Sequence, residues 1–199
     1  FGDIRLGSVV NNNQSSATSI LSILSQSGSI YLADDVNSYP SLHESSAVDI
    51  QAATNIEIMG RIASFSGSGS ASGQPGSISL RSTNGSVSVA HEIDSSSLIQ
   101  AAEVTVEAYG DINLAQIISG GAAQIHGANV TINSSHGSVG LDGVLTAGDD
   151  DAGEISISAL IDVHIRGATP LFGGSQFGLD STSNSTPQSI AGDIYLNTI

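Results

Sequence analysis

The sequence predicts an all-β protein, a right-handed parallel β-helix (β-solenoid) with three sides and about eight coils of about 26 residues. The first observation is spacing: triplets of apolar, polar and apolar residues recur at a nearly constant period, beginning at Ile78, Val104, Val130 and Ile155. The second is a companion series that follows each member of the first at a short, nearly constant offset, beginning at Val87, Ile112, Val139 and Val163. The third is that no stretch keeps a helical spacing of apolar residues over two turns. Triplets at a fixed period indicate stacked repeats.

The same frame extends toward both ends of the chain. Triplets continue it at the same period on the N-terminal side, at Ile4, Ile30 and Ile56. The next step, from Ile56 to Ile78, is shorter than the period and indicates a shortened coil. On the other side Ile194 follows Ile155 after a longer step, which indicates a loop insertion at about residues 167–191. Residues 1–199 are therefore predicted to form a single β-solenoid domain.

Alternation within each triplet places the two aliphatic side chains inside and the middle residue outside. Stacked aliphatic residues then form ladders, a setting that suits β-branched side chains. Ile99 and Ile125, again one period apart, indicate the third side of each coil. Right-handed winding is the default for parallel crossovers. Four outward residues form a hydroxyl row between Glu57 and Tyr195, namely Ser79, Thr105, Thr131 and Ser156. Such a row can order water or stack on sugars, and a plain solvated face explains it equally well.

The charge balance excludes two classes of partner. The chain has 19 acidic residues, four arginines and no lysine, which gives a formal net charge of −15. Nucleic acids and anionic membranes both need Lys and Arg to neutralise phosphates, so we expect no nucleic-acid binding. No apolar run is long enough to span a bilayer, so we expect no membrane insertion. The absence of cysteine excludes disulfides and thiolate metal sites.

Short runs of glycine, a small polar residue and a triplet recur at residues 76–80, 85–89 and 110–114, and alternate with a run at 128–132. In this respect the chain resembles the repeat zones of large secreted β-helical exoproteins and adhesins of the filamentous-haemagglutinin type, exported by two-partner secretion. The resemblance implies a secreted, extracellular rod at the cell surface and carries over no catalytic residue. The chain departs from that family in its longer coils and in lacking the secretion-domain motif.

The densest acidic cluster is the candidate metal site of the sequence. It consists of Asp149, Asp150, Asp151 and Glu154, beside glycines. Carboxylate oxygens suit Ca²⁺, although the spacing is not that of an EF-hand and a solvated acidic loop explains the same residues. We expect no other cofactor.

The sequence predicts no catalytic residues. The five histidines lack a metal-ligand spacing, and His164 lies near Asp162 on an outward strand position. Polysaccharide lyases and hydrolases also use parallel β-helices, so a glycan-binding or glycan-cleaving protein is the alternative function. A lyase for acidic glycans would need basic residues, and the four arginines are scattered. A hydrolase would need paired carboxylates, whereas Asp111 and Glu154 begin strands in different coils.

Both ends of the frame are predicted to be uncapped edges. The chain opens with Gly2, Asp3, Ile4, Arg5 and Leu6, and closes with Gly192, Asp193, Ile194, Tyr195 and Leu196. Exposed strand edges pair with further strands, and a head-to-tail contact that does not close generates a filament. The preferred function is therefore structural: a subunit or shaft segment that stacks into an extracellular filament, sheath or adhesin fibre. Its partners would be copies of itself or flanking repeats of a longer chain, with cell-surface glycans as a further candidate.

Overall fold

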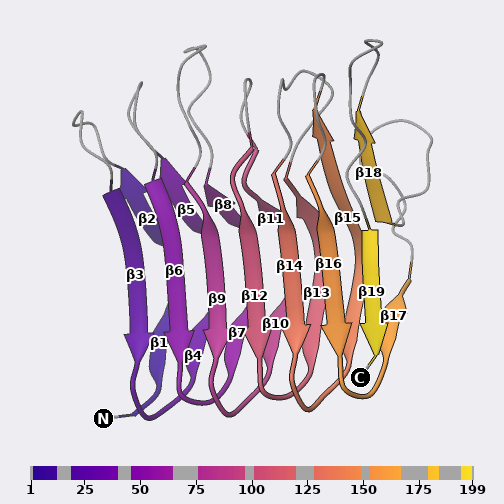
Figure 1. The fold of residues 1–199 in the computed structure, drawn as a ribbon. Helices are drawn as coiled ribbons and strands as arrows, with labels where there is room; N and C mark the ends of the chain where they lie inside the picture. The colour runs from indigo at the N-terminus through magenta and orange to yellow at the C-terminus, as the bar shows by residue number, and fades with distance from the viewer. Residues whose placement is uncertain are drawn as a thin grey trace.

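The computed structural model describes residues 2–12, 19–39, 46–64, 76–96, 101–119, 128–148, 153–166, 179–183 and 194–198. Within these ranges the chain forms β-strands and no helix, and every strand pairing is parallel (Figure 1). The predicted β-solenoid is therefore confirmed. In Figure 1 the chain descends through the front strands, rises through the back strands and advances from left to right, which is a right-handed winding.

Each turn of the chain, here called a rung, contributes strands to three faces. The first face carries β1 (Ile4–Leu6), β4 (Ile30–Leu32), β7 (Ile56–Ile58), β10 (Val87–Val89) and β17 (Val163–Ile165). The second face carries β2 (Val9–Asn12), β5 (Val36–Tyr39), β8 (Ile62–Ser64), β11 (Ile93–Asp94) and β18 (Leu179–Ser183). Two longer strands run through both faces and join them into one 12-stranded sheet: β13 (Ile112–Ile118) and β15 (Val139–Gly148).

The third face is a separate 7-stranded sheet. Its strands are β3 (Ser19–Ser25), β6 (Ser46–Ala52), β9 (Ile78–Ser82), β12 (Val104–Ala108), β14 (Val130–Ser134), β16 (Ile155–Ala159) and β19 (Ile194–Thr198). Seven strands give seven rungs, slightly fewer than the predicted eight coils. Strands stack about 4.8 Å apart, so the rungs form a short rod.

The difference in rung number comes from a change of face that the triplets hide. Ile56 pairs with Val87 on the first face, whereas Ile78 pairs with Val48 on the third face. The predicted ladder had placed Ile56 and Ile78 in one column with a shortened coil between them, and that interpretation is wrong. The rung between them is in fact lengthened, since the step along the chain from Ile56 to its partner Val87 is longer than the step from Ile30 to Ile56.

The second face begins shortly after the start of the first, for example at Val36 after Ile30 and at Ile117 after Ile112. Ile99 and Ile125, which were predicted to mark this side, lie outside the described residues. The predicted insertion at 167–191 contains β18, which pairs with β15 and supplies the second face of the last rung.

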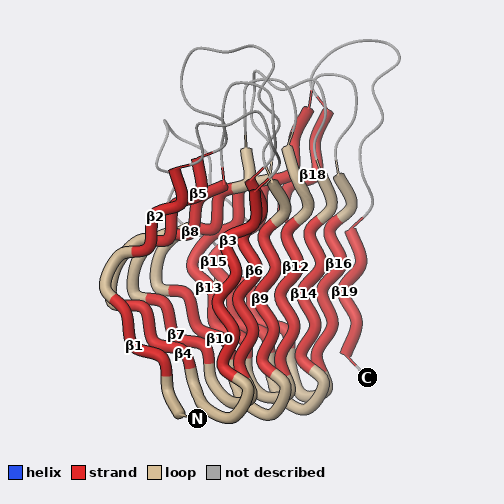
Figure 2. The backbone as a smooth tube through the Cα atoms, turned by 90° about the vertical axis from the view of Figure 1, so that its left-hand side faces the viewer, coloured by secondary structure: helices blue, strands red, loops and turns tan. Residues whose placement is uncertain are grey.

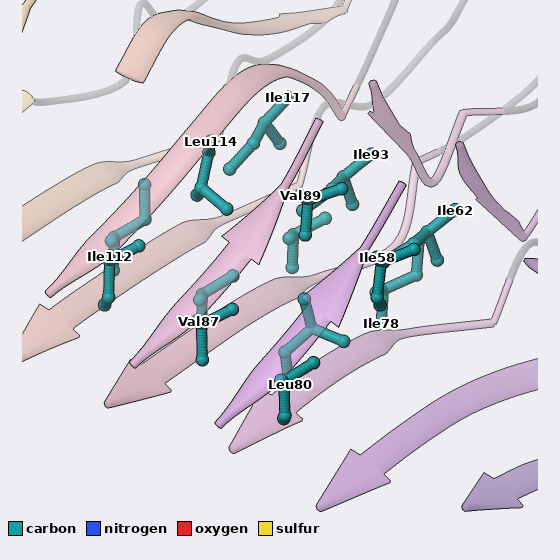
Figure 3. Packing of buried hydrophobic residues seen from close by; sticks show 14 of the residues in the cluster. Ile58, Ile62, Ile78, Leu80, Val87, Val89, Ile93, Ile112, Leu114 and Ile117 are labelled. Atoms are coloured by element: carbon teal, nitrogen blue, oxygen red, sulfur yellow. The ribbon is translucent and has the colours of Figure 1, made fainter. Parts of the chain in front are cut away.

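The interior consists of aliphatic columns that continue from rung to rung (Figure 3). One column of buried residues passes through Ile58, Val89 and Leu114. Another passes through Ile62, Ile93 and Ile117. Burial of each such side chain contributes about 1.5–3 kcal/mol to the stability of the fold. In an inner rung these side chains are covered by the rungs on both sides.

Figure 2 shows the first-face strands β1, β4 and β7 continuing through a turn into β2, β5 and β8 of the second face. Buried hydroxyls hold the corner between the second and third faces. On five successive rungs a fully buried residue of this kind ends the second face: Ser38, Ser64, Ser95, Ser119 and Thr146. The Ser64 hydroxyl donates to the carbonyl of Ser46 at 2.7 Å and accepts the N–H of Gly76 at 2.9 Å. The Thr146 hydroxyl donates to the carbonyl of Gly153 at 2.8 Å. The strands on either side of this corner are thus held together by side-chain bonds.

Candidate functional site

The first rung ends in an exposed strand edge. The strand β1 lies at one end of the 12-stranded sheet, and its outward Arg5 lies 5.7 Å from the Tyr31 ring centre in the next rung. Leu6 pairs in register with Leu32, yet Leu6 is 43% exposed while Leu32 is fully buried. Val10, Ile20 and Leu24 of the same rung are also exposed, but at outward positions that pair with Asn37, Ala47 and Gln51. At its inward position Leu6 is therefore an apolar side chain that a preceding rung would cover.

The last rung exposes the opposite edge. The strand β19 ends the 7-stranded sheet, and its Leu196 is 54% exposed although its partner in register, Ile157, is buried. Tyr195 is exposed beside it. The preceding corner also exposes Leu160 and Ile161. Gly192 and Asp193 lie outside the described residues, so the structure gives no position for them.

The two predicted edge triplets lie at opposite ends of the rod and on different faces. Ile4 belongs to the first face and Ile194 to the third face. In a continuous stack the triplet at Ile4 would therefore follow β17 and not β19. The strand that would follow β19 is β3.

The corner from the third face to the first alternates between two forms, which the sequence analysis missed. A long corner reads Ser-x-x-Gly-Ser and occupies residues 25–29, 82–86 and 134–138. A short corner begins with Ala and ends with Asn or Asp, and it occupies residues 52–55, 108–111 and 159–162. The Ser-x-x-Gly-Ser motif, repeated every second rung, is the signal that could have revealed this alternation.

Side-chain and backbone bonds seat each long corner on the short corner before it. In one example Ser134 Oγ donates to the Gly110 carbonyl at 2.7 Å, and the N–H of Ser138 donates to Asp111 Oδ1 at 2.8 Å. A Cβ on Gly137 would lie 2.5 Å from Asp111 Oδ1 and 2.6 Å from the Gly110 carbonyl carbon. Only glycine fits there because the two corners are in van der Waals contact.

The predicted metal cluster is not brought together by described residues. Asp149, Asp150 and Asp151 lie outside the described residues, and Glu154 is exposed at the start of the third face. Its backbone N–H donates to Asn129 Oδ1 at 2.8 Å. Among the described residues, no three His, Asp or Glu side chains could hold a metal ion together. Ca²⁺ binding by the full cluster stays a prediction.

The predicted hydroxyl row is present on the third face. Ser79, Thr105, Thr131 and Ser156 pair in register on four successive rungs. The residue that precedes them is Asp49, since Glu57 lies on the first face; Tyr195 follows them as predicted.

Each arginine pairs with an acidic residue of the chain. Arg61 Nε lies 2.8 Å from the Glu92 carboxylate and Arg61 Nη2 lies 2.5 Å from Asp94 Oδ2, while Arg166 Nε lies 2.7 Å from Asp142 Oδ1. The contacts of Arg81 with Glu107 and of Arg5 with Asp3 are longer, at 3.6 Å and 3.9 Å. The positive charges are thus neutralised locally and do not form one basic surface.

The other residues considered for chemistry are separated by the fold. Asp111 precedes a first-face strand and Glu154 precedes a third-face strand, so they lie on different corners. His164 and Asp162 are both exposed on the last rung. His136 stacks on Tyr109 with ring centres 4.0 Å apart, next to a shallow hollow of 170 Å³ lined in part by Arg81, Glu107 and Tyr109. This aromatic pair was not singled out from the sequence, where its two residues lie a full rung apart.

Comparison with known proteins gives no match: no family model, no curated protein and no solved structure is similar to this chain. In the part of the chain that the structure describes, no helix is long and apolar enough to cross a membrane.

Proposed function

We propose that this chain is a structural β-solenoid, a subunit or shaft segment that stacks end to end in an extracellular filament, sheath or adhesin fibre. The observation that carries the proposal is the exposed apolar edge at each end of the rod. Residues of one column are fully covered in inner rungs and roughly half-exposed in the end rungs, as Leu32 and Leu6 illustrate. A further parallel rung on either edge would bury these side chains and pair the free strand edges.

The extracellular setting is supported by the resemblance in repeat style to secreted exoproteins. The net charge of −15 favours solubility of a protein whose edges are apolar. Copies of the chain or flanking repeats of a longer chain are the partners that this function requires.

Electron microscopy of the purified chain over a range of concentrations tests the proposal. We expect rods of uniform width whose length increases with concentration, and an X-ray reflection near about 4.8 Å along the fibre axis. Monodisperse monomers at high concentration, with no fibres in micrographs, would contradict end-to-end stacking.

A second function, glycan binding, is favoured by one observation. Tyr109 is exposed beside the hollow that Arg81 and Glu107 also line. An aromatic ring can stack on the face of a sugar, and a neighbouring charged pair can hydrogen-bond to the sugar hydroxyls. A glycan array with the wild-type chain and Tyr109→Ala, combined with a reducing-sugar assay, tests this function. Binding that is lost in the variant supports it, and release of reducing ends would show a glycan-cleaving enzyme.

A further inference from the structure

We propose that the last rung of one copy receives the first rung of a second copy in parallel register, and that the Asp162 carboxylate accepts the backbone N–H of the second copy's Asp3. This inference rests on the proposed stacking function and deepens it, because it names the partner, the polarity and the residues of the contact.

Residues at the position equivalent to Asp162 have the same hydrogen-bonding role in other rungs. The equivalent residues of three earlier rungs, Asp3, Asn55 and Asp111, each use Oδ1 to accept the backbone N–H of the following rung. Those distances are 3.0, 2.9 and 2.8 Å. The Asp162 side chain is exposed, and no described residue donates a hydrogen bond to it. It is therefore an acceptor positioned for the N–H of a rung that would follow.

The residue that packs on such a corner from the next rung has to be glycine, and Gly2 meets this requirement. A Cβ on Gly28, Gly85 or Gly137 would lie between 2.4 and 2.6 Å from the nearest atom of the corner in the preceding rung, which is too close for a side chain. Gly2 occupies the same position two residues before its first-face strand. A Cβ on Gly2 would meet nothing within 4 Å of the chain itself. The first rung thus leaves free the space that a preceding short corner such as residues 159–162 needs.

Gly2 and Asp3 also resolve a mismatch in the alternation of corners. The last rung follows a short corner, so the next rung should begin as rungs after a long corner do, with glycine followed by a residue whose N–H donates to the preceding corner. The second rung begins with a long corner, which needs a side-chain acceptor in the first rung. Asp3 supplies this acceptor, since its Oδ1 accepts the N–H of Ser29. The pair Gly2-Asp3 combines the glycine of one form with the side-chain acceptor of the other, so the same rung can satisfy both neighbours.

Register follows from the faces. Ile4 would lie opposite Val163, Arg5 opposite His164 and Leu6 opposite Ile165, continuing the first-face ladder. The strand β19 would meet β3, so that exposed Leu196 is covered. Arg5 would enter the contact together with Asp3 and place a cation close to the two carboxylates. A head-to-head or tail-to-tail contact would leave either Asp162 without an N–H or Gly2 without a corner to accommodate.

Paired cysteines test polarity and register together, because the chain has none of its own. Neighbouring strands about 4.8 Å apart are within the Cα separation that a disulfide needs. In the double variant Arg5→Cys with His164→Cys, both residues are exposed, so the fold should be kept. We expect oxidation to give a reducible ladder of covalent oligomers on non-reducing gels. The single variants Arg5→Cys and His164→Cys are the controls, and we expect neither to form covalent dimers efficiently.

The acceptor itself is tested by measuring the dissociation constant of end-to-end association. Asp162→Asn keeps Oδ1, as Asn55 does naturally, and should leave the constant within about twofold, while Asp162→Ala should raise it about fivefold to tenfold. Urea unfolding under monomeric conditions should be unchanged in both, which separates an effect on the contact from one on the fold.

The outcomes distinguish this inference from the proposed function. If the wild-type chain assembles but the double variant gives no ladder, the single variants form dimers, or Asp162→Ala associates as tightly as wild type, this contact is refuted and stacking stands. If the wild-type chain does not assemble and the double variant forms no ladder, both are refuted.

Discussion

Leu6 and Leu32 offer a direct measure of what a covering rung contributes. They occupy adjacent positions of one first-face column and pair in register. Leu32 has rungs on both sides and is fully buried, whereas Leu6 has a rung on one side and is 43% exposed. The matched changes Leu32→Ala and Leu6→Ala remove the same atoms from the two environments.

The expected costs differ severalfold. Leu32→Ala removes a fully covered side chain and leaves a cavity between rungs, which costs about 3–5 kcal/mol. Leu6→Ala loses a little over half of a leucine's burial and leaves no closed cavity, which costs about 1 kcal/mol. A chain of this size has a urea m-value of about 2 kcal/mol/M, so the unfolding midpoint should fall by about 1.5–2.5 M for Leu32→Ala and by about 0.5 M for Leu6→Ala.

Far-UV circular dichroism during urea titration, at a concentration where the chain is monomeric, gives both midpoints. Stacked repeats do not always unfold in one step, so tyrosine fluorescence should be followed as a second probe. Equal shifts for the two variants, or a shift below about 0.5 M for Leu32→Ala, would refute the view that inner rungs are stabilised from both sides. At concentrations where copies stack, the cost of Leu6→Ala should rise toward that of Leu32→Ala.

Three further changes have expected results. Gly85→Ala should destabilise the chain by about 1–3 kcal/mol because its Cβ would lie 2.6 Å from the Thr54 carbonyl carbon; Gly7→Ala, with nothing within 4 Å, should be nearly neutral in the same urea titration. Arg61→Ala should cost about 1–3 kcal/mol because it leaves the buried Asp94 without its cation, whereas Arg81→Ala removes an exposed pair worth less than about 1 kcal/mol; thermal unfolding compares them. Raising NaCl should strengthen end-to-end association, measured by light scattering, because copies of net charge −15 repel one another; weaker association in salt would contradict an apolar contact.

The sequence was sufficient for the fold class because each rung repeats the same apolar alternation. It was not sufficient to assign triplets to faces. First-face and third-face strands both bury two aliphatic residues around a polar one, so Ile56 and Ile78 look alike although they belong to different sheets. Only the strand pairing in the structure distinguishes the two triplets. Because the third rung is lengthened, the spacing of the triplets does not show the change from the first face to the third.

The candidate site was predicted in part. That the triplets at Ile4 and Ile194 are edge strands followed from the repeat frame, but the frame did not show that they lie on different faces. The role of Asp162 could not be inferred from its own neighbourhood, since acceptor and donor lie one rung apart. Its equivalents Asp3, Asn55 and Asp111 recur every second rung, a double period that a single-coil frame of about 26 residues averages away.

The buried hydroxyls between the second and third faces make one corner of this rod tolerant of length. Ser64 bonds to a residue 12 positions ahead and Thr146 to one only 7 ahead, yet both hold the two strands in the same stacked arrangement. Chain added there changes the loop entropy only slowly with length, about 0.6 kcal/mol per doubling. This corner is therefore the place to graft foreign peptides. Grafts on successive rungs would form a regularly spaced row of epitopes, about 4.8 Å apart, on one side of the protein.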